Sequence, residues 1–166
     1  MKRIILITGG QRSGKSKKAE ELALSLSSNP VYLATAHIWD DEFRKRVRRH
    51  QERRGPEWTT IEEEIHLSRH DMTGRVVVID CVTLWLTNML DSSLQGNLEK
   101  AFAEFDAFTA PEATYIFVTN EIGLGGVSEN ALQRRFTDLQ GMMNQYIAAR
   151  ADEVILMISG IPVKLK

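Results

Sequence analysis

Short apolar runs rich in β-branched residues alternate along the chain with longer segments in which apolar residues recur every three or four positions. The apolar runs predict strands, and the segments with a helical period predict helices. The expected strands cover residues 3–8, 31–36, 75–80, 114–120 and 154–159. The expected helices cover residues 15–27, 40–54, 82–90, 94–108 and 129–150. We expect residues 161–166 to pair back antiparallel after a turn at Gly160.

The order of these elements predicts an α/β fold in a single domain that spans residues 1–166. Most expected strands are nearly continuous apolar runs, which is typical of a parallel sheet covered by helices on both faces. Strands that alternate with helices predict a mostly parallel sheet with right-handed crossovers. Ligands of such sheets bind at the carboxyl ends of the strands. The polar residues that follow the strands are therefore the first candidates for a functional site.

Composition and charge exclude several classes of function. The 22 acidic and 21 basic residues leave a net charge of -1, so no overall field attracts nucleic acid or anionic lipid. The single cysteine, Cys81, cannot form an internal disulfide, and a cysteine-type metal site is excluded. The apolar run near the N-terminus is too short for a signal peptide, and no later run is long enough to span a bilayer. We therefore expect a cytoplasmic protein with no membrane insertion.

A glycine-rich motif stands directly between the first expected strand and the first expected helix. It reads GGQRSGKS and fits G-x-x-x-x-G-K-S, the phosphate-binding loop (P-loop) of many nucleotide-binding proteins. The backbone N–H groups of such a loop surround phosphate oxygens, the lysine neutralises the β- and γ-phosphates, and the serine hydroxyl holds Mg²⁺. The alternative is an ordinary glycine turn, against which the filled motif and its flanks argue. The predicted nucleotide contacts here are Gly9, Gly10, Gln11, Arg12, Ser13, Gly14, Lys15 and Ser16.

An acidic residue for the same metal stands at the end of the third expected strand. Asp80 closes the run VVVID, so its carboxylate is expected beside the P-loop, where it would hold Mg²⁺ directly or through a water. The alternative is an N-cap for the helix that begins near Val82, and the two roles are compatible. Together the two motifs predict a protein that hydrolyses or transfers nucleotide phosphate.

A strongly basic segment, residues 44–54, reads RKRVRRHQERR. Helical spacing places His50 on the same face as Phe43 and Val47, and Arg54 continues this face. An imidazole on an inward face among arginines suits an anionic ligand, and cationic neighbours favour its neutral, nucleophilic form. The alternatives are a structural histidine on a solvated basic helix and a nucleic-acid patch. Spacing alone makes His50 a candidate nucleophile.

Two further histidines, His66 and His70, stand four residues apart on a possible helix. No third ligand residue is evident nearby, so we do not predict a metal site there.

Residues 119–126 read TNEIGLGG and follow the fourth expected strand. Asn120 and Glu121 are therefore expected at the same sheet edge as Asp80, and the glycines would let the backbone approach a bulky ligand. The alternative is a flexible crossover in which Glu121 is merely solvated.

Taken in order, these motifs resemble one family nearly end to end. The matching segments are ITGGQRSGKS, YLATA, DCVTLWLTNML, the run that begins TNEIGLGG, and the terminal SGIPVKLK. The chain resembles the adenosylcobinamide kinase/adenosylcobinamide-phosphate guanylyltransferase family of cobalamin biosynthesis. The resemblance implies a RecA-like P-loop sheet and a bifunctional enzyme. Such an enzyme phosphorylates adenosylcobinamide with ATP or GTP. It then transfers GMP from GTP to adenosylcobinamide phosphate through a GMP-histidine intermediate, giving adenosylcobinamide-GDP and pyrophosphate.

The resemblance also assigns roles to particular residues. The family's catalytic histidine falls on His50, which with Lys15 would carry the chemistry. Assembly as a homotrimer, without nucleic acid, is implied as well. Further nucleotide contacts of the family fall on Ala34, Thr35, Ala36, Gln51, Glu52, Arg53, Arg54, Glu62 and Leu84.

Two other functions compete with this interpretation. One is a single-function small-molecule kinase in which His50 is structural. The other is a RecA-like NTPase stimulated by nucleic acid that binds along the basic segment. Against the second stand the balanced net charge and the lack of aromatic residues within the basic run.

Overall fold

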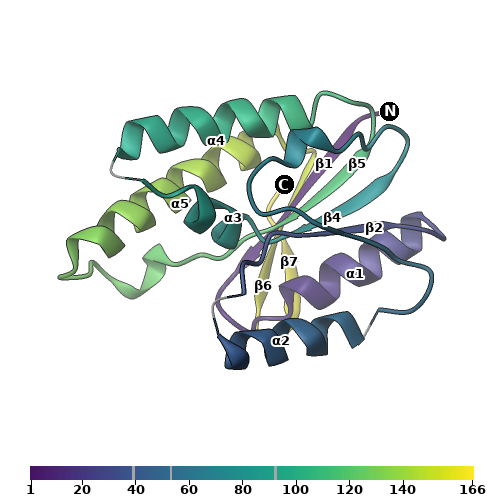
Figure 1. Ribbon diagram of the computed structural model, residues 1–166, viewed down its shortest axis with the longest axis horizontal. Coiled ribbons are helices and arrows are strands. Elements are labelled where there is room, and N and C mark those ends of the chain that lie inside the picture. Colours follow the sequence, from purple (N-terminus) through teal and green to yellow (C-terminus); the bar gives the residue numbers. More distant parts are fainter. Residues whose placement is uncertain (39, 53, 92) are drawn as a thin grey trace.

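A central β-sheet organises the molecule (Figure 1). The computed structural model describes residues 1–38, 40–52, 54–91 and 93–166, and within the second helix the side chains of Phe43, Arg46, Arg49 and His50 lie outside this description. The strands are β1 (Arg3–Gly9), β2 (Val31–Ala34), β3 (Thr59–Glu62), β4 (Val76–Asp80), β5 (Thr114–Val118), β6 (Glu153–Ile158) and β7 (Ile161–Lys164). The helices are α1 (Lys15–Leu26), α2 (Asp41–Glu52), α3 (Val82–Met89), α4 (Leu94–Phe108) and α5 (Ala131–Arg150), with short 3-10 helices η1 (Leu67–Arg69) and η2 (Gly123–Gly125).

The described strands form a seven-stranded sheet in the order β3-β2-β4-β5-β1-β6-β7. All neighbours pair in parallel except β6 and β7, which are antiparallel. The predicted α/β class, the mostly parallel sheet and the antiparallel C-terminal strand are confirmed. The order also places β5 beside β1, the strand that leads into the P-loop, and β4 beside β5, so the carboxyl ends of these three parallel strands meet at one edge.

One strand, β3, was not predicted. It reads TTIE, and only Ile61 among its residues is apolar. Because β3 is an edge strand that pairs only with β2 and is largely exposed, it needs no apolar run to form. A sequence pattern that is sensitive to buried strands therefore misses it.

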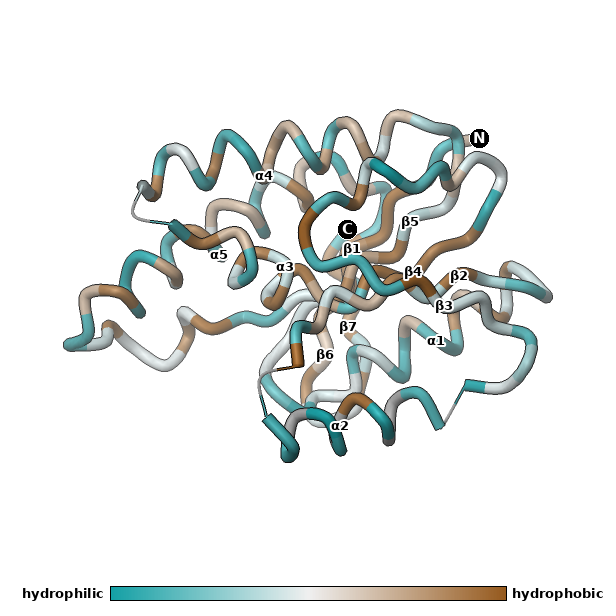
Figure 2. The backbone as a smooth tube through the Cα atoms, in the orientation of Figure 1, coloured by the Kyte–Doolittle hydropathy of each residue, from teal (hydrophilic) through white to brown (hydrophobic). Residues whose placement is uncertain are grey.

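Each central strand packs its two faces against different helices. Ile4 and Leu6 belong to a core that includes Trp85, Phe105 and Leu139 of α3, α4 and α5. The alternate residues of β1 pack with the buried alanines of α1 on the opposite face. Figure 1 shows α1 and α2 on one side of the sheet and α3, α4 and α5 on the other, and Figure 2 shows apolar residues along the central strands. Burying one large apolar side chain contributes about 1.5–3 kcal/mol, so this double-sided core holds the strand ends in fixed positions.

The helix boundaries follow local signals. Ser93 caps α4 by accepting a hydrogen bond from the Gly96 N–H, and Asn130 caps α5 by accepting one from Gln133. The basic helix α2 ends at Glu52, two residues before the predicted end at residue 54. None of the helices in the described parts of the chain combines the length and apolar character that crossing a membrane requires.

Candidate active site

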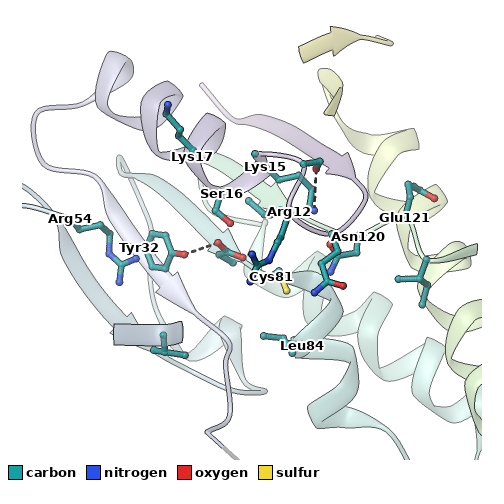
Figure 3. A pocket seen from close by; sticks show the side chains of 17 residues that line it. Arg12, Lys15, Ser16, Lys17, Tyr32, Arg54, Cys81, Leu84, Asn120 and Glu121 are labelled. Carbon is teal, nitrogen blue, oxygen red and sulfur yellow. Dashed lines mark hydrogen bonds between the residues drawn. The ribbon is translucent and has the colours of Figure 1, made fainter. Parts of the chain in front are cut away.

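A cavity of about 980 Å³ opens at the carboxyl ends of the central strands (Figure 3). Its walls come from the loop after β1, from β2, β4 and β5, and from α2 and α3. The lining residues are Gln11, Arg12, Ser13, Gly14, Lys15, Ser16, Lys17, Tyr32, Val47, Arg54, Asp80, Cys81, Leu84, Val118, Asn120, Glu121 and Ile122. Most of the predicted P-loop contacts, Asp80 and Leu84 therefore share one cavity, which is large enough for a nucleotide.

The backbone of the P-loop requires glycine at two of its motif positions. At Gly9 the φ angle is +150°, and an added Cβ would stand 2.5 Å from the carbonyl oxygen of Met157 on β6. At Gly14, which caps α1, φ is +94°, a left-handed conformation that side chains disfavour. The Gly160 N–H also donates to the Ser13 carbonyl at 3.0 Å, which ties the loop to the turn between β6 and β7. The loop is thus held from the sheet side and stays open toward the cavity.

Lys15 and Ser16 open helix α1 at the floor of this cavity. The Lys15 ammonium is buried and donates to the Gly10 carbonyl at 2.6 Å. Backbone N–H groups at the start of a helix and a lysine folded over the same loop make this part of the cavity positive, which suits a phosphate. Both residues thus line the cavity, and their roles toward phosphate and Mg²⁺ stay predictions.

Asp80 ends β4 beside the P-loop and lines the same cavity. Its carboxylate accepts a hydrogen bond from the Tyr32 hydroxyl at 2.7 Å. The N-cap of α3 is Cys81 and has no side-chain cap hydrogen bond, so the alternative role of Asp80 as the helix cap is not observed. The acidic group is left facing the cavity, where the prediction of a metal-side carboxylate requires it.

Arg54 lines the cavity, but not as part of the basic helix, where its spacing from His50 had placed it. Because α2 ends at Glu52, Arg54 lies beyond the helix and does not continue its face. Its guanidinium stacks 3.6 Å from the centre of the Tyr32 ring and stands 3.9 Å from Glu20 of α1. The side chain is only 4% exposed. Arg54 therefore carries a buried positive charge from the segment after α2 to the edge of the P-loop site.

Several other predicted contacts lie beside the cavity and do not line it. Gln51 donates to Glu62 at 3.5 Å, which joins the end of α2 to the end of β3. Thr35 is fully buried, and its hydroxyl donates to the Cys81 carbonyl and accepts from the Cys81 N–H, both at 2.8 Å. The Thr35 side chain thus clamps β2 to the start of α3. Ala34, Ala36 and the exposed Glu52 are also absent from the cavity walls.

His50 and Arg53 were both predicted as site residues. The backbone of His50 belongs to α2, one turn after Val47, a residue whose side chain lines the cavity. The His50 side chain and all of Arg53 lie outside the described residues. Arg44 and Arg48 on the same helix are exposed.

The loop after β5 is anchored by a buried polar network. Glu121 accepts hydrogen bonds from Thr8 at 3.1 Å and from Asn144 at 3.2 Å, and its N–H donates to the Gly9 carbonyl at 3.0 Å. These contacts hold Asn120 and Glu121 at the cavity wall beside the P-loop. The alternative in which Glu121 is merely solvated is therefore wrong.

His66 and His70 flank the 3-10 helix η1, and His70 contacts Glu63 at 3.3 Å. Within the described ranges, no three His, Cys, Asp or Glu side chains gather as a metal-binding group.

Sequence reasoning missed one prominent member of the site, Tyr32. It is a polar aromatic residue inside an otherwise apolar strand, two positions before the strand ends at Ala34. That oddity is a signal, because a buried tyrosine hydroxyl usually has a partner. The partner, Asp80, lies 48 residues away in the chain and was out of reach of local patterns.

Comparison with known proteins finds relatives along almost the whole chain. A family model described as cobinamide kinase / cobinamide phosphate guanyltransferase matches residues 5–165. The chain is 40% identical over 181 residues to the bifunctional adenosylcobalamin biosynthesis protein CobU of Escherichia coli (strain K12), covering 98% of this chain and 99% of the relative. It is 38% identical over 169 residues to the bifunctional adenosylcobalamin biosynthesis protein CobP of Pseudomonas aeruginosa, covering 97% and 96%.

A solved structure supports the fold. The KaiC-like protein PH0186 from the hyperthermophilic archaeon Pyrococcus horikoshii OT3 matches with a TM-score of 0.51 at 14% identity, covering 93% of this chain and 70% of that chain. This similarity confirms the predicted RecA-like P-loop architecture and, at that identity, carries no further conclusion about function.

Proposed function

The chain belongs to the cobinamide kinase / cobinamide phosphate guanyltransferase family, and we propose that both reactions of this family take place at the P-loop edge of its sheet. The first reaction transfers the γ-phosphoryl group of ATP or GTP to the hydroxyl of adenosylcobinamide. The second transfers GMP from GTP to the resulting phosphate. The observation that carries the proposal is one cavity shared by the P-loop, Asp80, Arg54 and Val47 of the basic helix.

For the kinase reaction, positioning and charge are the main requirements. The N–H groups of the P-loop and the Lys15 ammonium bind the phosphates of the donor. The substrate hydroxyl attacks the γ-phosphorus, the bond to the bridging oxygen breaks, and the nucleoside diphosphate leaves. Lys15 stabilises the charge that develops on the phosphoryl oxygens.

The residues present also fit Mg²⁺, the metal ion that kinase chemistry implies. The Ser16 hydroxyl and the Asp80 carboxylate line the same cavity, and oxygen ligands of this kind suit Mg²⁺. When bound with the nucleotide, Mg²⁺ supplies charge neutralisation at the phosphate oxygens. We assign Ser16 and Asp80 as the protein groups that hold it.

For guanylyl transfer we assign His50 as the nucleophile. A neutral imidazole nitrogen attacks the α-phosphorus of GTP, pyrophosphate leaves, and an N–P bond to GMP forms. A phosphate oxygen of adenosylcobinamide phosphate then attacks the same phosphorus, and the N–P bond breaks to give adenosylcobinamide-GDP. The place of His50 on α2, one turn after the cavity residue Val47, supports this role. Arg54 offers a buried positive charge for the GMP phosphate.

A labelling experiment tests the His50 assignment. The protein is incubated with GTP labelled at the α-phosphate, and an acid-labile, base-stable protein adduct is measured. We expect label on the wild type and on His66→Asn, a control at an exposed histidine outside the cavity. His50→Asn should carry no label, should lose guanylyl transfer, and should keep most of its kinase activity. Label on His50→Asn would overturn the assignment, and so would an unlabelled wild type that still transfers GMP.

We also propose a homotrimer, which the family resemblance implies. The C-terminal edge strand β7 supports self-association, because among the described strands it pairs only with β6 and it exposes Ile161 and Val163. Light scattering coupled to size-exclusion chromatography tests this proposal. A mass equal to one 18.8 kDa chain at micromolar concentration would contradict it.

A further inference from the structure

Tyr32 lies between the two halves of the candidate active site. Its hydroxyl contacts Asp80, and its ring contacts Arg54 (Figure 3). We propose that Tyr32 is a positioning residue that holds the Asp80 carboxylate for the kinase reaction and the Arg54 guanidinium for guanylyl transfer. This inference rests on the proposed function, because it assigns Asp80 and Arg54 to those two reactions.

The contact with Asp80 is directional. The 2.7 Å hydrogen bond joins a tyrosine that is 4% exposed to a carboxylate at the end of the neighbouring strand β4. The phenol hydroxyl is the donor of this bond, and the carboxylate accepts it. One carboxylate oxygen is engaged by the protein, and this fixes the direction in which the other can face the cavity.

The contact with Arg54 supports a charge that has few hydrogen bonds of its own. Among the described residues, the buried Nε and Nη1 atoms of Arg54 have no hydrogen-bond partner. Its ion pair with Glu20 of α1 spans 3.9 Å, which is too long for a hydrogen bond. The guanidinium stacks on the face of the Tyr32 ring at 3.6 Å, and Trp58 supports that ring edge-on at 5.9 Å. A substitution that removes the Tyr32 ring therefore removes the surface on which the Arg54 guanidinium stacks.

The two contacts use different parts of one side chain, so they can be separated by substitution. Tyr32→Phe removes the hydroxyl and keeps the ring over Arg54. Tyr32→Leu removes both. A side chain with a purely structural role would affect both reactions together, whereas a positioning role predicts that the phenylalanine variant impairs only the reaction that depends on Asp80.

The experiment measures both reactions separately, with adenosylcobinamide as the kinase substrate and adenosylcobinamide phosphate supplied directly for guanylyl transfer. For Tyr32→Phe we expect kcat/KM of the kinase to fall about tenfold, since a hydrogen bond to a charged group is lost. Guanylyl transfer should stay within about twofold of the wild type, because the ring that supports Arg54 remains. For Tyr32→Leu we expect guanylyl transfer to fall about tenfold as well.

A second readout is independent of turnover. Calorimetry measures binding of a non-hydrolysable ATP analogue with Mg²⁺ and, in a parallel titration, with a metal chelator. Tyr32→Phe should weaken binding of the Mg²⁺ complex roughly fivefold and leave binding of the metal-free analogue unchanged. In the Asp80→Asn background, Tyr32→Phe should have no further effect on either measurement, because the two groups act as one unit.

The chain contains a matched control on the opposite side of the sheet. Tyr146 donates to Asp106 at 2.7 Å, and the Arg150 guanidinium stacks 3.4 Å from the centre of the Tyr146 ring. The same arrangement of tyrosine, aspartate and arginine therefore occurs away from the cavity. Tyr146→Phe should leave both reactions and both binding measurements unchanged.

Two results would overturn the inference: a Tyr32→Phe variant that matches the wild type in kinase activity and Mg²⁺-dependent binding, or equal loss of both reactions in that variant. A wild type that fails to perform one reaction would instead contradict the proposed function, and the binding measurements would still decide the role of Tyr32 toward Asp80.

Discussion

Thr119 lies at the centre of the buried polar network beneath the candidate active site. Its hydroxyl donates to the Asn144 side-chain oxygen at 2.7 Å and accepts from the Gln140 amide at 2.8 Å. Thr119 and Gln140 are at most 1% exposed, and Asn144 is 7% exposed. Asn144 in turn donates to the Asn120 carbonyl and the Glu121 carboxylate, both at 3.2 Å. The network therefore connects α5 to the loop that lines the cavity.

Thr119→Val keeps the volume of the side chain and removes both hydrogen bonds of the hydroxyl. The Gln140 amide and the Asn144 oxygen keep the 2.9 Å bond between them, so neither group loses its only partner. We expect the free energy of unfolding to fall by about 1–2 kcal/mol, because the buried network is weakened but no buried polar group loses its last hydrogen-bond partner. For a domain of this size that corresponds to a decrease of roughly 3–6 °C in the melting temperature.

Urea denaturation followed by circular dichroism measures the change in stability, and hydrogen exchange measures its location. The Glu121 N–H, which donates to the Gly9 carbonyl, should exchange faster in Thr119→Val, because the loop has lost part of its anchor. The matched control is Thr109→Val: Thr109 is 2% exposed, but its hydroxyl donates only to the Phe105 carbonyl, which also accepts the Thr109 N–H. The control should lose less than about 0.7 kcal/mol. A Thr119→Val variant as stable as the wild type, or a control that loses as much, would refute the reasoning.

Three further predictions concern other parts of the chain. Lys15→Met should lower the kinase kcat about 100-fold or more, because one preorganised cation at the phosphates is lost; an unchanged kcat in a steady-state assay would place the phosphates elsewhere. Burial raises the pKa of the Cys81 thiol to about 12, so iodoacetamide at pH 8 should label the protein only in urea, as mass spectrometry can show. Burial alone would raise the pKa of Glu63, but hydrogen bonds from the backbone N–H groups of Ile65 and His66 and from His70 outweigh it and lower the pKa. The stability contributed by Glu63 is therefore present at neutral pH and is lost as the pH falls through its lowered folded-state pKa, so Glu63→Gln should reduce the stability difference between pH 7 and pH 3 in urea melts.

The parts of this structure that sequence predicts well are those encoded by neighbouring residues. The P-loop is eight consecutive residues whose backbone conformation depends on glycines at fixed places, and α4 and α5 begin at residues that cap them. The end of α2 is less clear, because the basic pattern continues to Arg54 while Gly55 and Pro56 already disfavour a helix. The extension to residue 54 followed charge and apolar spacing and overlooked these two residues.

The parts that sequence does not predict depend on contacts between distant segments. Tyr32 meets Asp80 only because β2 and β4 are neighbours in the sheet, and that pairing skips β3 in chain order. Arg54 reaches Tyr32 from a segment whose path is set by α2 and by the edge strand β3. The local sequence marks Tyr32 as unusual but does not identify Asp80 or Arg54 as its partners, so these contacts become visible only when the strand order is known.

The strand order also explains how the residues proposed for the two reactions come to lie at a single edge of the sheet. The P-loop follows β1, Asn120 follows β5, Asp80 ends β4, and Tyr32 lies near the end of β2, and these four strands are consecutive in the sheet. The basic helix α2 lies in the connection from β2 to β3, the edge strand of the sheet. Figure 1 shows α2 beside α1, the helix that follows the P-loop. A residue on α2 that faces the sheet must therefore approach the P-loop from the β2 side. That geometry places Tyr32, the β2 side chain that lines the cavity, between Asp80 on one side and Arg54 on the other.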